Sequence, residues 1–340
     1  MKTNVRCWIN PLGLAHLPSS DSESEAWPSL EMANSRTQFS DALLKLARDR
    51  LNSFFLPGSS REKCVDFVVD GKHIGYIKPD VKEQLLKYPD VFVVNNSLGI
   101  DDIQFHPNLK TSDDRSDRLA TVLQEWREKS CFSTLKGWRN ECYDIWSGNR
   151  TLKLFKVERS AVGLFGLVQY GVHINGYLNH STKGLCMWIG RRSPTKQTYP
   201  GLLDNMAAGG ITSGDTVMVT ARKECREEAS VPDEILDRLK PAGVISYFME
   251  EERGLLSEQE FIMDLEVTED FKPVVSDGEV DKFQLMTIEE VKESVTAGKF
   301  KANCGLVIAD FMYRHGIITP DNEPHYCEIQ QYMHTRLPQS

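Results

Sequence analysis

The spacing of hydrophobic residues first predicts a small α+β unit. Apolar residues from Phe39 to Leu51 recur at helical spacing, and Pro57-Gly58 ends that segment. Two apolar runs then flank Asp70-Gly71, which favours a hairpin turn because both positions of that turn have positive φ. Later patterns predict a helix, a strand and a helix, at residues 79–87, 91–94 and 114–131. We therefore expect an N-terminal α+β domain at residues 34–140, without a catalytic constellation.

From about Asn140 onward the pattern favours strands. The apolar runs are YDIWS, TLKLFKVE, FGLVQYGVHINGYL, GLCMWIGRR, AGVISYFME, QEFIMDLEV and DKFQLMTI. Two helices follow, near residues 288–297 and 304–314. Several links between the runs are too short to hold crossover helices, so the sheet is not all-parallel. We expect a second domain at residues 141–330, built on a mixed sheet.

The segment GGITSGDTVMVTARKECREEASV, residues 209–231, carries the strongest candidate chemistry. If it is helical, the spacing of Glu224, Glu227 and Glu228 puts three carboxylates on one face. Like charges so placed repel one another, and this repulsion destabilises the helix. A hard divalent cation such as Mg²⁺ or Mn²⁺ removes the repulsion because it binds the carboxylate oxygens. The alternative is an acidic helix face that contacts only solvent.

The same segment has the features of a helix that packs on a sheet. A second face carries small or apolar side chains four positions apart, namely Val217, Ala221, Cys225 and Ala229. Ser213 or Asp215 is the expected N-cap, because their side-chain oxygens accept from the first free backbone N–H groups. The thiol of Cys225 therefore faces the sheet and is expected to be inert.

Residues 209–231 resemble the Nudix box, the signature of hydrolases that cleave a nucleoside diphosphate linked to another moiety. Glu224, Glu227 and Glu228 match its three metal-region carboxylates. Four positions depart from the box, where Glu, Arg, an aliphatic residue and Gly are replaced by Asp215, Lys223, Cys225 and Ser230. The last departure matters most, because Gly ends the helix with a positive φ that Ser adopts less easily. The resemblance implies an α/β/α sandwich and metal-dependent hydrolysis.

A longer stretch is similar to the thiamine pyrophosphokinase-related branch of Nudix proteins. The matching segments are HINGY, WIGRRSPTK and TYPGLLDNMAAGG, at residues 173–177, 188–196 and 198–210. In that branch an N-terminal domain of its own type precedes the hydrolase domain. The resemblance implies hydrolysis, not kinase chemistry, with thiamine diphosphate and its damaged oxo- and oxythiamine forms as substrates and phosphate as a product.

The resemblance also implies roles for individual residues. Glu227 and Glu228 are the expected metal ligands, and Glu224 is either a third ligand or the base that deprotonates water. A backbone carbonyl in such proteins also reaches the metal, a role that falls on Gly209. A further carboxylate comes from beyond the helix, where we expect Glu279, with Asp277 in reserve; the alternative for Glu279 is a solvated turn carboxylate.

Positive charge must meet the diphosphate. Arg191, Arg192 and Lys196 lead into the box and are the expected substrate-binding residues, because Arg clasps a phosphate with two hydrogen bonds and Lys offers a point charge. The alternative is a solvated basic turn. His173 has no metal-ligand partner at a useful spacing, so we expect a hydrogen-bonded core histidine.

Composition excludes several classes of function. The 340 residues carry a formal net charge of −9, which argues against a nucleic-acid binder because such proteins need a basic footprint. The eight cysteines form no C-x-x-C pair, which favours reduced thiols inside a cell over zinc or disulfides. No apolar run approaches the ~18 residues of a membrane span. Residues 1–33 read as a flexible leader of a cytoplasmic protein, with mitochondrial targeting as the alternative.

Other functions stay open at this point. One alternative is a diphosphate sensor that has lost turnover, and another is an interaction protein whose N-terminal domain recruits a partner. A third is a Nudix hydrolase of nucleoside diphosphate derivatives such as ADP-ribose. The pattern favours an enzyme with a small-molecule diphosphate substrate and leaves the oligomeric state open.

Overall fold

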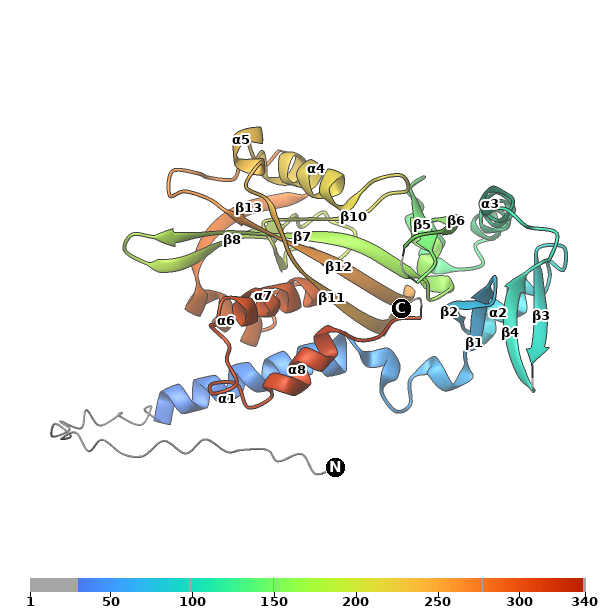
Figure 1. Ribbon diagram of the computed structural model, residues 1–340, viewed down its shortest axis with the longest axis horizontal. Helices are drawn as coiled ribbons and strands as arrows, with labels where there is room; N and C mark the ends of the chain where they lie inside the picture. Colours follow the sequence, from blue (N-terminus) through green and yellow to red (C-terminus); the bar gives the residue numbers. More distant parts are fainter. Residues whose placement is uncertain (1–29, 98, 149, 277, 339–340) are drawn as a thin grey trace, which may run out of the picture.

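The computed structural model describes residues 30–338 except residues 98, 149 and 277. The predicted leader at residues 1–33 lies mainly outside the described residues, and its last four residues belong to α1 (Leu30–Leu44). Two mixed sheets organise the described chain, a smaller one in its first half and a larger one in its second (Figure 1).

The smaller sheet has the strand order β2-β1-β4-β3. Its elements are β1 (Val65–Val69), β2 (Lys72–Ile77), α2 (Pro79–Leu85), β3 (Phe92–Ser97), β4 (Ile100–Phe105) and α3 (Ser112–Glu128). The turn between β1 and β2 is confirmed, since Asp70 has a φ of 52° and Gly71 a φ of 72°. The strand β4, which pairs in parallel with β1, was not predicted. It carries the aspartates Asp101 and Asp102, and these interrupt the apolar pattern.

The larger sheet has the order β11-β12-β7-β8-β13, with β10 beside the first half of β7 and β9 beside β8. Its strands are β7 (Val168–His180), β8 (Gly184–Arg192), β9 (Leu203–Asp204), β10 (Ala207–Gly210), β11 (Lys240–Glu251), β12 (Gly254–Glu266) and β13 (Val280–Thr287). Only β12 and β7 pair in parallel, so the expected mixed sheet is confirmed.

Helices cover both faces of the larger sheet (Figure 1). On one face lie α4 (Val217–Ala229) and the short α5 (Asp233–Leu236), and on the other lie α6 (Ile288–Thr296) and α7 (Ala302–Arg314). The result is the expected α/β/α sandwich. Among the described residues, no helix is both long and apolar enough to cross a membrane.

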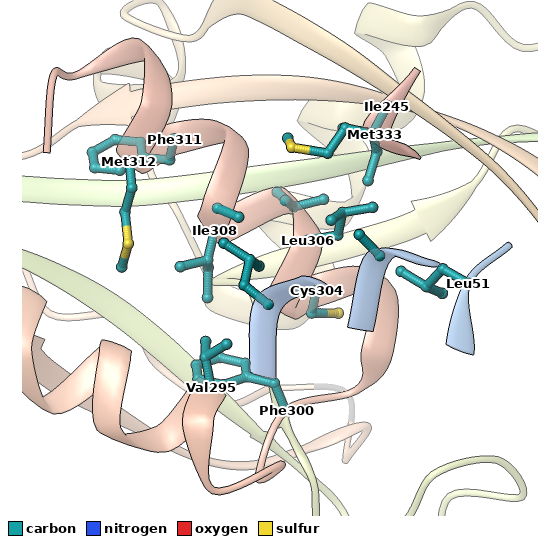
Figure 2. Close-up of a cluster of buried hydrophobic side chains, with 14 of the residues drawn as sticks. Leu51, Ile245, Val295, Phe300, Cys304, Leu306, Ile308, Phe311, Met312 and Met333 are labelled. Atoms are coloured by element: carbon teal, nitrogen blue, oxygen red, sulfur yellow. The ribbon is translucent and has the colours of Figure 1, made fainter. Parts of the chain in front are cut away.

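A further layer covers α6 and α7. It consists of α1, the π-helix at Lys45–Arg50 and α8 (Tyr326–Met333). Figure 2 shows Leu51, which follows the π-helix, in one buried cluster with Met333 of α8 and Leu306 of α7. The sequence pattern assigns the first helix, α1, to the N-terminal domain. In the structure this helix instead packs against the C-terminal helices of the second predicted domain.

The strands β5 (Cys142–Trp146) and β6 (Lys153–Glu158) pair only with each other. Their buried side chains, such as Ile145 and Phe155, belong to one cluster with Phe67 of β1 and Trp126 of α3. The sequence pattern places both strands in the second domain. The domain bounds 34–140 and 141–330 stay predictions, and the buried core of the smaller sheet extends past residue 140.

Candidate active site

The helix α4 packs on the sheet through the face that the sequence predicts. Ala221, Cys225 and Ala229 are fully buried, and burial raises the pKa of the Cys225 thiol to about 12, so this thiol stays protonated. The N-cap is Thr216, whose hydroxyl accepts from the backbone N–H of Val219, and not Ser213 or Asp215.

Ser230 ends α4 in the left-handed conformation, with φ 50° and ψ 39°. The backbone N–H of Ser230 donates to the carbonyl of Arg226, and that of Val231 donates to the carbonyl of Cys225. These bonds satisfy carbonyls that the last turn of a helix leaves free. The expectation that Ser230 occupies the position of the helix-ending glycine in the box agrees with this geometry.

Ser230→Gly is expected to raise the free energy of unfolding by up to about 1 kcal/mol, because glycine adopts positive φ without the Cβ penalty of serine. The Ser230 side chain is exposed, so its removal leaves no cavity. Urea unfolding of the two proteins measures the difference. A clear loss of stability would show that the Ser230 hydroxyl makes a contact that matters more than the backbone strain.

The three glutamates of α4 lie beside the edge strand β10. The carboxylate of Glu224 lies directly over Gly209, where an added Cβ would come within 2.2 Å of its Cδ. Glu228 is buried, and its Oε2 accepts from the backbone N–H of Ala208 at 2.9 Å. Glu227 is half exposed, with Lys223 Nζ 3.9 Å from its Oε2. The absence of a side chain at Gly209 is therefore what lets Glu224 approach the strand.

A cavity of about 590 Å³ opens beside these glutamates. Of the residues predicted for the site, it is lined by Gly209, Glu224, Glu227, Glu279, Arg192 and Lys196. Glu228 lies behind this wall, held by Ala208. Arg191 lines a separate hollow between β8, β13 and α6. Asp277 lies outside the described residues.

The two predicted cations that reach the cavity already have partners. Arg192 is buried and donates to Asp204 Oδ2 at 2.7 Å and to the carbonyls of Tyr199 and Thr198 at 3.0 and 2.8 Å. Lys196 contacts the carboxylate of Glu279. Arg192 thus fastens the loop before β9, whereas Lys196 lies next to the predicted metal ligands.

The segment before β7 supplies another wall of the cavity. Arg159 forms an ion pair with Glu141 at 3.1 Å and lies over the ring of Tyr143, 5.5 Å from its centroid. The Tyr143 hydroxyl occupies the space above Gly210, where an added Cβ would come within 2.0 Å of it. Arg139 also lines the cavity and donates to Gln197 at 3.2 Å. The first part of the chain therefore completes the pocket beside the larger sheet.

The floor of the cavity is a buried polar network on the α7 face of the sheet. His173 Nδ1 lies 2.8 Å from Asn205 Oδ1, and His173 Nε2 lies 3.7 Å from Glu260 Oε1. Asn303 of α7 donates to Glu260, and Glu258 accepts from the hydroxyl of Tyr247. As expected, His173 is a hydrogen-bonded core histidine. Burial alone would lower its pKa, but the charge of Glu260 raises it well above the ordinary value.

Ligand-type atoms of His173, Asp204 and Cys304 lie within 4.8 Å of one another on this floor. The sequence spacing gave no sign of this group. The atoms are already in use, because Arg192 donates to Asp204 and Cys304 Sγ donates to Asp204 Oδ1 at 2.7 Å. A cation here would also meet the charge of Arg192, so the group serves the hydrogen-bond network.

The α4 carboxylates have the properties of a divalent-metal site. Burial raises the pKa of Glu224 to about 7, and the charges of Glu227 and Glu279 add to this effect. Burial and the charge of Asp204 likewise raise the pKa of Glu228 well above its ordinary value. Without a bound cation, these buried carboxyls resist ionisation. A hard cation such as Mg²⁺ or Mn²⁺ would favour their ionised form, because its charge offsets the repulsion among the carboxylates.

Metal binding is therefore expected to matter more as the pH rises. Glu224 has an ordinary pKa of 4.5 and a folded value of about 7, so its burial costs no stability below pH 4.5. The cost grows as the pH rises from 4.5 through about 7 and is then constant. Mg²⁺ bound at Glu224 would remove this cost, so the gap in melting temperature between Mg²⁺ and EDTA should widen by several degrees over that range. A gap that is constant with pH would contradict this.

Two family models match the chain. One is described as a domain of unknown function, DUF4743, and matches residues 42–169; the other is described as the NUDIX domain and matches residues 170–304. An uncharacterized protein of Saccharomyces cerevisiae is 35% identical over 285 residues, which cover 79% of this chain and 82% of that protein.

Two plant proteins are similar over nearly the same length. Nudix hydrolase 20, chloroplastic, of Arabidopsis thaliana is 34% identical over 278 residues, which cover 80% of this chain and 73% of that protein. Nudix hydrolase 24, chloroplastic, of the same plant is 34% identical over 266 residues, which cover 78% of this chain and 71% of that protein. These matches confirm the expected fold class and the expected class of enzyme.

The sequence pattern missed the cavity residues that come from outside the box, namely Arg139, Tyr143, Arg159, Tyr247, Glu258, Glu260 and Lys301. One signal was available for two of them. Glu258 and Glu260 are two positions apart in one strand, so both carboxyls must share one face of the sheet. A buried pair of this kind marks a polar cavity.

Proposed function

The chain belongs to the Nudix hydrolases, and from this premise we propose that it hydrolyses thiamine diphosphate and, with preference, its damaged oxo- and oxythiamine forms. Nudix hydrolases act on diphosphate compounds with the help of divalent metal ions. Water attacks one phosphorus, a new P–O bond forms, the bridging P–O bond breaks, and a monophosphate and inorganic phosphate leave.

One observation carries the choice of substrate. The three segments that resemble the thiamine-directed branch all contribute to the cavity wall. His173 comes from the first segment and Arg192 and Lys196 from the second; the third contributes Thr198, Tyr199, Asp204, Ala208, Gly209 and Gly210. The similarity to this branch is thus concentrated around the space that a substrate would fill. A cavity of about 590 Å³ lies within the range typical of small-molecule sites.

We assign the metal site to Glu224, Glu227 and Glu228, with Glu279 as a further carboxylate. When bound, a Mg²⁺ or Mn²⁺ ion supplies positive charge to the diphosphate and makes water more acidic. Glu279 is supported by its place on the cavity wall and by its effect on the pKa of Glu224. Glu224 is either the third ligand or the base that accepts the proton of the attacking water, because its carboxyl lines the cavity beside Glu227.

The register of β10 bears on the proposed backbone ligand. Gly209 is in register with Val172 of β7. The carbonyl oxygen of Gly209 lies toward β7, because an added Cβ on Gly171 would come within 3.3 Å of it. The N–H of Ala208 points away from β7 to Glu228, and the carbonyl of the same residue shares that direction. If a backbone oxygen of this strand reaches the metal, the geometry favours Ala208 over Gly209.

The positive charge for the diphosphate falls on residues that line the cavity. Lys196 keeps the role predicted for it, and Arg159 joins it, because Arg159 lines the same cavity as the carboxylates of Glu224 and Glu227. Arg191 lines another hollow, and Arg192 holds Asp204. We therefore propose Lys196 and Arg159 as the groups that bind phosphate oxygens.

The test measures release of inorganic phosphate from thiamine, oxothiamine and oxythiamine diphosphates and formation of AMP from ADP-ribose, whose cleavage yields two monophosphates. Each reaction is run with Mg²⁺, with Mn²⁺ and with EDTA. We expect metal-dependent release from the thiamine compounds, and larger specificity constants for the damaged forms. Activity on ADP-ribose alone would overturn the substrate and leave the hydrolase class standing. Binding without release from any compound would favour a sensor.

A further inference from the structure

The ammonium group of Lys301 has no ion-pair partner. Among the described residues, no carboxylate oxygen lies within 4.0 Å of its Nζ, and it makes no hydrogen bond. Most of the other cations that line the cavity are paired with a carboxylate, as the pairs Arg159–Glu141, Arg192–Asp204, Lys196–Glu279, Lys223–Glu227 and Arg253–Glu251 show. Arg139, at the exposed rim, has Gln197 as a partner.

The backbone around Lys301 is fixed. Lys301 is the N-cap of α7, and its N–H donates to the carbonyl of Leu203 at 2.9 Å, where Phe300 and Leu203 form a parallel bridge. Its Nζ lies 5.9 Å from the centre of the Tyr199 ring, inside the cavity. The charge is thus held on a rigid part of the floor.

The charges around Lys301 cancel one another in pairs. Arg192 forms an ion pair with Asp204, whose charge also attracts Lys301 at longer range, and protonated His173 lies beside Glu260. Burial and the charge of Glu260 raise the pKa of Glu258 to about 7, so this carboxyl is largely neutral below that pH. Burial alone would lower the pKa of Lys301, but the surrounding acidic groups raise it. Lys301 therefore remains charged. Among the described cations that line the cavity, it is the one without a hydrogen-bond or ion-pair partner for its side chain.

We propose that Lys301 is a specificity-determining residue that selects oxothiamine diphosphate over thiamine diphosphate. The inference rests on the proposed function. Thiamine has a cationic thiazolium ring, which an unpaired ammonium group repels in a poorly solvated cavity. The oxo form has a neutral ring with a carbonyl oxygen, which can accept a hydrogen bond from that ammonium group. One residue thus disfavours the intact cofactor and favours its damaged form.

The test compares specificity constants within one preparation of each protein, so that any loss of folded enzyme cancels. In Lys301→Met, we expect the ratio of kcat/KM for oxothiamine over thiamine diphosphate to fall by about tenfold or more. The ratio for oxythiamine over thiamine diphosphate should stay constant, because oxythiamine is altered in the pyrimidine ring and keeps the thiazolium charge. Lys301→Arg should keep most of the wild-type preference.

Two further variants complete the experiment. Lys301→Gln keeps a hydrogen-bond donor without the charge and serves if the Met variant folds poorly. Lys299→Met removes a lysine two residues away that lines the other hollow, and its ratios should match the wild type. If the three constants fall equally in the Lys301 variants, the residue binds phosphate and the proposal is wrong. If the wild type hydrolyses none of the thiamine compounds, the proposed function fails as well.

Discussion

Turnover of diphosphate substrates is expected to fall by a factor of about a hundred or more in Glu227→Gln, while the melting temperature should stay near that of the wild type. Glu227 is half exposed and makes one weak ion pair, with Lys223, so glutamine replaces it at little structural cost. The substitution removes one negative charge from the metal site proposed on the α4 carboxylates. Phosphate release at saturating substrate and metal measures the effect, and thermal unfolding confirms the fold.

The matched control is Glu234→Gln, which removes an exposed glutamate of the neighbouring α5 that does not line the cavity. This variant should keep wild-type turnover and metal dependence. Full activity of folded Glu227→Gln at both limiting and saturating metal would contradict the assignment of the α4 carboxylates as the metal site. A loss at limiting metal with full turnover at saturating metal would show that Glu227 contributes only to metal affinity.

Arg192→Met is expected to lower the free energy of unfolding by about 3–5 kcal/mol, because it leaves the buried carboxylate of Asp204 without its partner. Two backbone carbonyls, those of Thr198 and Tyr199, lose a donor as well. Burial would raise the pKa of Asp204, yet the charges of Lys301 and Arg192 hold it at about 2, so the carboxylate stays ionised at neutral pH. Denaturant unfolding measures the loss.

The double variant Arg192→Met with Asp204→Asn should recover part of that stability, since the orphaned charge is gone. Lys196→Met is the comparison for the neighbouring cation, and it should raise KM with little change in melting temperature. A stable Arg192→Met protein that has lost affinity for diphosphates would restore Arg192 to the phosphate-binding role that the sequence suggested.

Local patterns explain why α4 and its carboxylates could be predicted. The helix repeat of 3.6 residues fixes which side chains share a face, so the spacing of Glu224, Glu227 and Glu228 is sufficient without tertiary information. The positive φ of Ser230 likewise follows from its place at the end of the helix. Each of these expectations depends only on residues within about four turns of one helix.

Non-local features could not be predicted in the same way. Arg191 and Arg192 are neighbours in sequence, but successive residues of a strand face opposite sides, so both cannot line one cavity. Recognising this requires knowing that β8 extends as far as Arg192. Lys301 and Arg159 reach the pocket only because α7 and the segment after β6 pack against the same sheet, and no spacing along the chain encodes that meeting.

The layer made by α1 and α8 has a consequence for synthesis on the ribosome. Asn52, just after the π-helix, donates to the carbonyl of Tyr332, and the side chain of Leu51 is buried with Met333. The early partner of each pair is translated long before the late one, so the apolar face of the first helix must wait until almost the whole chain has emerged. Fragments that lack either end would expose this surface, and a chaperone that binds apolar helices would find its target there.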